Sequence, residues 1–174
     1  MVKKNIFFVG LMAVGKTTVG KLLAKSLAMS FYDSDLVIED TAGTDIGWIF
    51  EKEGEKGFRD REAAVLKKLC KKNGIIISTG GGAVLRSDNR HLLSTHGIVI
   101  HLDCPIDVLV RRVGRDDRRP LLQDGNPFTI LSDLKIKRDP LYEQIADYKF
   151  ETLDQSPQVL SHNIERRLQS DGVI

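Results

Sequence analysis

Cysteine is scarce in this sequence, with only Cys70 and Cys104 among its 174 residues. The two positions show no CxxC or CxxH spacing, so the usual zinc and dithiol redox motifs are excluded. We expect both thiols to be reduced, as is usual in a cytosolic protein.

The sequence also lacks a concentration of charge of one sign. Its 26 Lys and Arg residues are spread along the chain and the formal net charge is only +2, whereas a nucleic-acid-binding protein typically has a basic stripe. One local excess follows residue 110, and it comprises Arg111, Arg112, Arg115, Arg118 and Arg119. We therefore expect no nucleic-acid partner.

Long apolar runs are absent as well. The first apolar run is broken by Gly10 and Lys16, so it is too short for a signal peptide or a membrane span. We expect a cytoplasmic protein without a membrane partner. No repeat, low-complexity tract or linker divides the chain, and its length suits a single domain.

What the sequence does contain is an alternation of short apolar runs with helical patterns. Strands are predicted over residues 6–9, 30–35, 75–79, 97–102 and 150–153. Apolar residues at helical spacing follow the first strand as far as Leu27, and further helices are predicted over 36–69 (with interruptions at glycines), 88–93, 105–113, 128–148 and 156–168. This alternation predicts an α/β fold in which helices cover both faces of a parallel sheet.

A phosphate-binding motif lies between the first strand and the first helix. The segment reads Gly10-Leu11-Met12-Ala13-Val14-Gly15-Lys16-Thr17 and fits GxxxxGK[ST] at every fixed position. Such a loop curls backbone N–H groups around a β-phosphate, and the following helix adds its positive N-terminal end. The lysine reaches the β- and γ-phosphates and the threonine hydroxyl ligates Mg²⁺. The position between strand and helix disfavours a chance match, so the sequence predicts a nucleoside triphosphate site.

A triphosphate site also serves GTPase-like switches, which are not kinases. The segment Asp40-Thr41-Ala42-Gly43 fits the DxxG pattern of such switches, but it lies in a helical pattern instead of following an apolar strand. The guanine-reading Asn-Lys-x-Asp motif is missing, and its nearest counterpart is Lys137-Arg138-Asp139. The switch interpretation is therefore disfavoured.

Three groups of residues are candidates for binding a phosphoryl acceptor. Asp33 and Asp35 follow the second strand, where one acid can support Mg²⁺ through water and the other can act as base. Three glycines, Gly80-Gly81-Gly82, follow a buried strand and favour a close approach of backbone to a ligand. Arg59 and Arg138 are suited to a carboxylate. The alternatives are a helix cap at Asp35, a plain flexible turn and solvated arginines.

Six segments in register resemble the shikimate kinase family over essentially the whole chain. They are Gly10–Thr18, Phe31-Tyr32-Asp33-Ser34-Asp35, Phe58-Arg59-Asp60-Arg61-Glu62, Ser78-Thr79-Gly80-Gly81-Gly82, Arg119-Pro120-Leu121-Leu122 and Arg138-Asp139-Pro140-Leu141-Tyr142. The resemblance implies a nucleoside monophosphate kinase-like fold with a five-stranded parallel sheet. It also implies a substrate-binding segment at about 33–62 and a lid at about 112–127.

The activity that this resemblance implies is transfer of the ATP γ-phosphate to the 3-hydroxyl of shikimate, on the route to chorismate and the aromatic amino acids. ATP and shikimate would be the ligands, Mg²⁺ the cofactor, and we expect a monomer. Two alternatives stay open: another small-molecule P-loop kinase, such as a gluconate kinase, and a non-catalytic nucleotide-binding protein.

The resemblance also implies a role for each site residue. Asp35 would hold the substrate hydroxyls as candidate base, and Arg59 and Arg138 would clamp the carboxylate. The glycines 80–82 would lie on the substrate, with the N–H groups of Gly81 and Gly82 facing it. Asp33 would lie near Mg²⁺, through water, with Thr17 as direct ligand. Lys16 and the lid residue Arg119 would act on the transferring phosphoryl group, and the remaining ATP contacts would be Ala13, Val14, Gly15, Thr18, Arg112 (stacked on adenine) and Gln155 (beside it).

One position departs from the family. Many members have glycine where this chain has Ala13, inside the phosphate loop. Alanine is comfortable only at negative φ. We expect the function to survive, because the fixed glycine Gly15 is intact, and we expect any effect to be on the local loop geometry.

Overall fold

The computed structural model describes residues 4–113, 125–153 and 155–174. Five parallel strands form one sheet in the order β2-β3-β1-β4-β5. The strands are β1 (Asn5–Val9), β2 (Ser30–Asp33), β3 (Ile75–Ser78), β4 (Gly97–Asp103) and β5 (Tyr148–Glu151). The predicted five-stranded parallel α/β fold is thereby confirmed.

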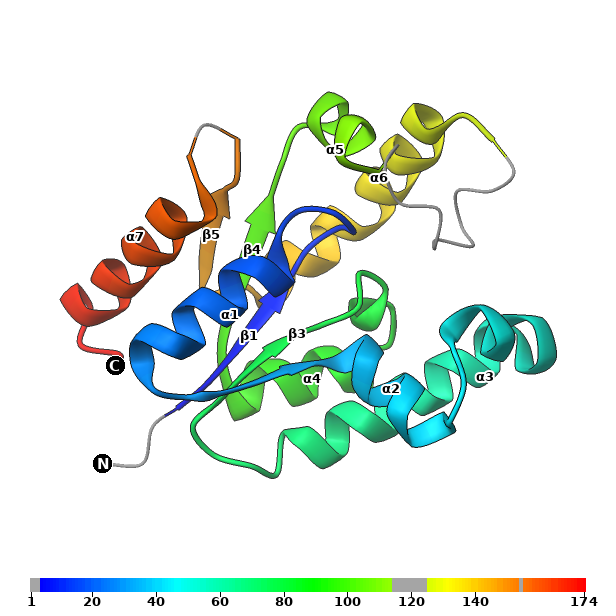
Figure 1. Cartoon of the computed structure of the whole chain (residues 1–174), viewed down its shortest axis with the longest axis horizontal. Helices are drawn as coiled ribbons and strands as arrows, with labels where there is room; N and C mark the ends of the chain where they lie inside the picture. The colour runs from blue at the N-terminus through cyan, green and yellow to red at the C-terminus, as the bar shows by residue number, and fades with distance from the viewer. Residues whose placement is uncertain (1–3, 114–124, 154) are drawn as a thin grey trace.

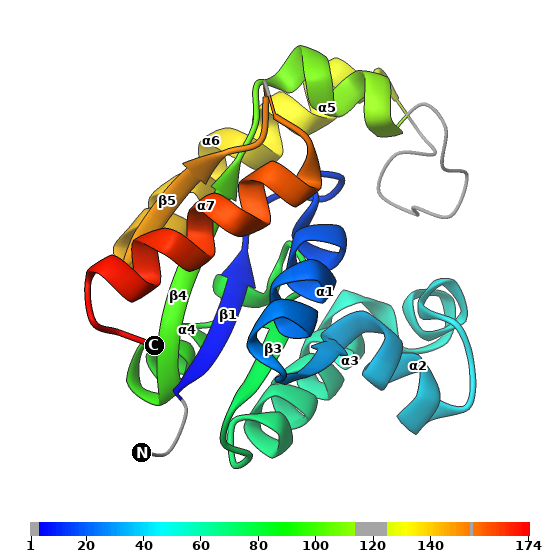
Figure 2. The same cartoon turned by 60° about the vertical axis from the view of Figure 1, so that its left-hand side comes forward.

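Helices cover both faces of the sheet, as Figures 1 and 2 show. One face carries α1 (Lys16–Leu27) and α7 (Pro157–Ser170), and the other carries α4 (Ser87–His96) and α6 (Pro127–Ile145). The remaining helical elements are α2 (Ser34–Ala42), α3 (Ile46–Leu69), α5 (Ile106–Val113) and the short 3₁₀ helix η1 (Ala83–Leu85). In Figure 1, α2 and the start of α3 extend beyond the β2 side of the sheet.

The core lies along the central strands. Every residue of β1 is buried, and so is every residue of β3. A strand that is buried on both faces needs apolar side chains at successive positions, and this explains the continuous runs Ile6-Phe7-Phe8-Val9 and Ile75-Ile76-Ile77. Both cysteines are buried and free, as expected.

Several predicted boundaries were wrong, most clearly in two parts of the chain. The second strand ends at Asp33, and Asp35 lies in the first turn of α2. The cause is the Asp33 carboxylate, which accepts hydrogen bonds from the N–H groups of Asp35 (3.0 Å) and Leu36 (3.4 Å) and so begins the helix. Near the other end of the chain, α6 stops at Ile145 and the last strand begins at Tyr148, ahead of the predicted start at residue 150.

The parallel arrangement brings the carboxyl ends of all strands to one edge. Asp33 at the end of β2 pairs in register with Ser78 at the end of β3, and Ser78 pairs with Phe8 of β1. The segments that follow these three ends carry the phosphate loop, the pair of acids and the triple glycine. Ligand sites of open α/β sheets lie at this edge.

Candidate functional site

The phosphate loop depends on its two fixed glycines for different reasons. At Gly10, φ is +144° and an added Cβ would lie 2.3 Å from the carbonyl oxygen of Leu102, so no side chain fits. At Gly15, which precedes α1, φ is +105°, a value that L residues rarely adopt. The motif is therefore required by the backbone path itself.

Ala13 takes a conformation that the sequence analysis did not expect. Its φ is +62°, in the left-handed region, where alanine is strained by roughly 1–2 kcal/mol. The loop thus keeps the path that a glycine would follow at this position. The strain falls on Ala13 because the loop path is set by the strand before it and the helix after it.

Lys16 and Thr17 begin α1 and face the loop and the sheet edge. The Lys16 ammonium donates to the carbonyl oxygens of Gly10 and Leu11, both at 2.8 Å, and its side chain is buried. The Thr17 hydroxyl donates to Asp33 Oδ2 at 2.7 Å and lies 3.1 Å from Ser78 Oγ. A hydroxyl and a carboxylate are hard oxygen donors of the kind that Mg²⁺ prefers. These residues therefore fit a magnesium site.

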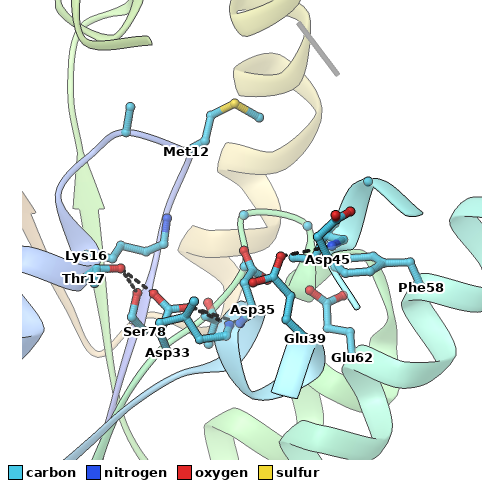
Figure 3. Close-up of a pocket in the computed structure, with 18 of the residues that line it drawn as sticks. Met12, Lys16, Thr17, Asp33, Asp35, Glu39, Asp45, Phe58, Glu62 and Ser78 are labelled. Carbon is cyan, nitrogen blue, oxygen red and sulfur yellow. Dashed lines mark hydrogen bonds between the residues drawn. The ribbon is translucent and has the colours of Figure 1, made fainter. Parts of the chain in front are cut away.

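A single cavity of about 1020 Å³ joins the phosphate loop to the acceptor residues. Figure 3 shows Lys16 and Thr17 on one side of it, Asp35, Glu39 and Glu62 on the other, and Asp33 between them. Its described lining includes most of the predicted site residues: Ala13, Gly15, Lys16, Thr17, Thr18, Asp33, Asp35, Arg59, Gly80, Gly81, Gly82, Arg112 and Arg138. The structure thus brings together residues from Met12 of the phosphate loop to Arg138 of α6, which are 126 positions apart in the sequence.

Asp35, which is half-buried, and Glu62, which is fully buried, are two carboxylates of this cavity. Burial, with a further contribution from Asp33, raises the pKa of Asp35 to about 6, although Lys16 and Arg59 act in the opposite sense. Burial likewise raises the pKa of Glu62 to about 7, against the opposing effect of Arg59. Among the described residues, Asp35 Oδ1 and Glu62 Oε1 have no hydrogen-bond partner. Within that part of the chain, both oxygens are thus buried without a partner, which agrees with the raised pKa values of the two carboxyl groups.

Glu62 is a site residue that the sequence analysis missed. Its Oε2 accepts from the Arg59 guanidinium at 2.7 Å, and its side chain is fully buried. The pair is spaced i, i+3 on α3, the spacing at which helical side chains meet. The i, i+3 spacing of Arg59 and Glu62 was the one feature of the sequence that indicated this contact.

The triple glycine is explained by the side chains that face it. An added Cβ on Gly80 would lie 2.7 Å from Asp35 Oδ1 and 2.8 Å from Glu62 Oε1. On Gly82 it would lie 2.2 Å from Arg59 Nη2, and on Gly81 it would lie 3.3 Å from Arg138 Nη1. None of the three has a φ in the left-handed region. The glycines are therefore needed for room, so that two acids and two arginines can pack directly on the loop backbone.

The backbone amides of this loop differ in what they bind. The Gly80 amide donates to the Ser34 hydroxyl at 3.0 Å, inside the protein. Within the part of the chain that the structure describes, no acceptor faces the amides of Gly81 and Gly82. Two of the three amides are thus left for a ligand, the same two that the resemblance assigned to the substrate.

Arg138 supplies the second predicted carboxylate contact. It lies on α6, its exposed fraction is 5%, and it lines the cavity beside the triple glycine. Arg59 reaches the same loop from α3, with 12% of its side chain exposed. Two guanidinium groups therefore converge on one wall of the cavity from different helices.

The remaining nucleotide residues have different placements. Arg112, in the last turn of α5, donates to the Ala13 and Val14 carbonyls (3.2 and 3.3 Å) and to the Thr152 carbonyl (3.0 Å), so it ties α5 to the phosphate loop. The Val14 side chain is buried in the core. Gln155 bonds to the Glu151 carbonyl and to Asn163, and it is not part of the described lining. Arg119 lies outside the described residues.

A second polar cluster lies under α6, away from the cavity. His101, Asp103 and Asp139 could each offer a metal-ligating atom within 4.8 Å of the others. However, the Lys135 ammonium bonds to Asp103 and lies 2.8 Å from Asp139, and Lys149 lies 3.3 Å from Asp103. These ammonium groups already neutralise the carboxylates, so we assign no metal there.

The switch pattern Asp40–Gly43 has a purely structural explanation. It forms the last turn of α2, with Gly43 as C-cap at φ +70°. This agrees with the expectation that the segment is helical. Across residues 4–113, 125–153 and 155–174, no helix has the length and apolar character needed to span a membrane.

Comparison with known proteins gives one consistent result. The family model described as "Shikimate kinase" matches residues 12–169. A curated shikimate kinase from Vibrio parahaemolyticus is 48% identical over 167 residues, which cover 96% of this chain and 97% of that protein. A shikimate kinase from Vibrio vulnificus is 49% identical over the same shares of both chains.

Solved structures agree with the sequence comparison. A shikimate kinase from Acinetobacter baumannii in complex with shikimate has a TM-score of 0.95 and 44% identity, covering 99% of this chain and 96% of that one. A gluconokinase from Sinorhizobium meliloti has a TM-score of 0.57 at 15% identity, with coverage of 95% and 98%. The second likeness shows a shared fold only, so it gives the gluconate kinase alternative no support beyond the fold.

Proposed function

The chain belongs to the shikimate kinase family, and we propose on this basis that it transfers the γ-phosphate of ATP to the 3-hydroxyl of shikimate with the residues gathered in the cavity. The observation that carries the proposal is the cavity itself, in which a phosphate loop and a carboxylate-binding, hydroxyl-binding wall face one another. Phosphoryl transfer needs both substrates in line, so catalysis depends mainly on positioning and charge.

The phosphate loop holds the donor. Its backbone N–H groups and the start of α1 bind the phosphates, and Lys16 places a positive charge at the β- and γ-phosphates. Thr17 would hold Mg²⁺ directly and Asp33 would support it through water, an assignment favoured by the 2.7 Å hydrogen bond between them. Bound Mg²⁺ neutralises phosphate charge as it develops. Arg112 and the lid residue Arg119 complete the assigned ATP contacts, with Gln155 beside the base.

The opposite wall holds the acceptor. Arg59 and Arg138 clamp the shikimate carboxylate, and the Gly81 and Gly82 amides donate to the substrate. Asp35 accepts the proton of the 3-hydroxyl as general base. Its raised pKa of about 6 supports this role, because a base works best with a pKa near the working pH. Glu62 fixes the direction of Arg59 through their 2.7 Å ion pair.

Further assignments complete the proposal. We propose that the chain forms one domain, which comprises a core, a substrate-binding segment at about 33–62 and a lid at about 112–127. We also propose that the protein is a cytoplasmic monomer and that ATP and shikimate are its small-molecule ligands.

A coupled ADP-release assay with ATP and Mg²⁺ tests the proposed activity. Shikimate, gluconate and a nucleoside monophosphate are compared as acceptors at equal concentration. The proposal requires ADP release that depends on shikimate, and equal or greater turnover with gluconate would replace it with the gluconate kinase alternative.

A further inference from the structure

Tyr142 connects α6 to the triple-glycine loop at one defined atom. Its side chain is completely buried, and its hydroxyl donates to the carbonyl oxygen of Gly81 at 2.5 Å. The phenol stays protonated and remains a donor, because burial raises the pKa of Tyr142 far above its usual value. A phenol has one hydrogen to donate, and here it is donated to the loop.

The geometry of a peptide bond turns this contact into a constraint on the ligand side. In a trans peptide the carbonyl of one residue and the N–H of the next point in opposite directions. The bond from Tyr142 fixes the Gly81 carbonyl toward α6, so the Gly82 N–H must point the opposite way. That amide has no acceptor among the described residues, and Gly82 lines the cavity.

The surroundings keep the phenol in place. The His101 ring of β4 packs on the Tyr142 ring with 5.1 Å between the ring centroids. His101 is 1% exposed, and burial lowers its pKa, so it stays neutral at neutral pH. Arg138, one turn before Tyr142 on α6, also interacts with the phenol. The loop is thus attached to a buried and packed part of the core.

Gly81 is also the point where the acceptor loop meets the donor loop. An added Cβ on Gly81 would lie 3.5 Å from both the Gly10 oxygen and the Met12 nitrogen. A rotation of the Gly81–Gly82 peptide would therefore disturb a backbone that borders both the acceptor wall and the phosphate loop. From the α6 side, the hydrogen bond of the Tyr142 hydroxyl to the Gly81 carbonyl opposes this rotation.

We infer that Tyr142 is a positioning residue, whose hydroxyl holds the Gly81–Gly82 peptide so that the Gly82 N–H is aimed into the acceptor site. This inference rests on the proposed function, since the acceptor it serves is shikimate. The residue touches no substrate itself and acts through the loop backbone.

Steady-state kinetics of Tyr142→Phe test the inference, with Tyr148→Phe as matched control. Tyr148 also loses a hydroxyl hydrogen bond, to Asp171 at 3.0 Å, but on the surface at the start of β5. Tyr142→Phe should raise the shikimate KM roughly tenfold, the effect of one misaligned hydrogen bond, with the ATP KM within about twofold. Tyr148→Phe should leave both unchanged.

A merely structural role for the hydroxyl predicts a different pattern. Partial unfolding would lower kcat through the active fraction and leave both KM values alone, and that result, or no change at all, would overturn the inference. Absence of shikimate-dependent turnover in the wild type would instead contradict the proposed function.

Amide NMR of the wild-type protein covers the case in which Tyr142→Phe does not fold. Shikimate should shift the Gly82 amide resonance strongly and the Gly80 amide, held by Ser34, only weakly. A Gly82 resonance that does not respond to saturating shikimate would overturn the inference without any variant.

Discussion

Replacing Gly82 by alanine should separate acceptor binding from nucleotide binding, because the three atoms nearest to the new methyl group all belong to the acceptor residue Arg59. The backbone allows the change, since φ at Gly82 is −95°. The added Cβ would lie 2.2 Å from Arg59 Nη2, 2.5 Å from Cζ and 2.6 Å from Nη1, whereas ordinary contact begins at 3.4 Å. The guanidinium must therefore move by at least about 1 Å, and its 2.7 Å bond to Glu62 opposes the movement.

The expected magnitude follows from that displacement. Misplacing a substrate-binding group by about 1 Å can cost about 100-fold in rate, which corresponds to roughly 3 kcal/mol of transition-state stabilisation. In the coupled ADP-release assay, Gly82→Ala should lower kcat/KM for shikimate by about that factor while the ATP KM stays within about twofold. A shikimate KM and kcat close to wild type would refute the claim that Arg59 needs this space.

Two alanine variants serve as controls. Gly81→Ala places its Cβ 3.3 Å from Arg138 Nη1, a contact that a small shift relieves, so its effect should be at most a few-fold. Gly20→Ala places its Cβ 2.7 Å from the Phe31 ring, remote from the acceptor wall, and should lower the melting temperature without changing either KM. An equal loss of kcat/KM in all three would mean that destabilisation, not displacement of Arg59, causes the effect.

Four further variants test other parts of the account. Asp35→Asn should lower kcat by about 10²–10⁴ with ATP affinity intact, and near-normal turnover would remove Asp35 as base. Arg138→Ala should raise the shikimate KM by roughly 100-fold, and a change confined to the ATP KM would place the clamp elsewhere. Ala13→Gly should relieve the roughly 1–2 kcal/mol of strain at φ +62°, offset by about 0.4–1 kcal/mol of unfolded-state entropy, so calorimetry should show a net gain between about 0 and 1.6 kcal/mol; a clear loss would contradict the strain. Both carboxylates have raised pKa values, so the stability that their neutral forms confer is present below pH 3.8–4.5 and lost as the pH rises to about 6–7; Glu62→Gln should flatten that fall in denaturant titrations, and an unchanged pH profile would argue against the raised pKa of Glu62.

The fold was largely predictable from the sequence because each central strand is buried on both faces. Burial on both faces requires consecutive apolar residues, as in Ile6–Val9 and Ile75–Ile77. The edge strands carry a weaker signal. In β2 and β5 most positions are partly exposed, and their predicted boundaries were wrong by two residues at one end or more.

The donor half of the site was predictable because its spacing is fixed by backbone geometry around a phosphate. The acceptor half needed side-chain positions that spacing alone does not give. Asp33 and Asp35 stand two apart in sequence, yet one caps α2 and binds Thr17 while the other faces Glu62 across Gly80. The direction of each side chain separates their roles, and the direction of a single carboxylate cannot be read from a polar sequence segment.

Glu62 and Tyr142 show what was missed and why. Each lies in a segment whose arginine was the predicted site residue. Each also acts through a partner: Glu62 through Arg59 and Tyr142 through Gly81. A residue that acts through another leaves no motif of its own. The i, i+3 spacing on α3 was the only sequence signal for the first, and none pointed to the second.

In the proposed function, one cavity holds ATP on the phosphate loop and shikimate on the opposite wall. The most direct test is ADP release by the wild-type protein with ATP and Mg²⁺, with shikimate, gluconate or a nucleoside monophosphate as acceptor. Turnover should saturate with shikimate and give one shikimate 3-phosphate for each ADP. Turnover that is independent of shikimate, or greater with either other acceptor, would contradict this proposal.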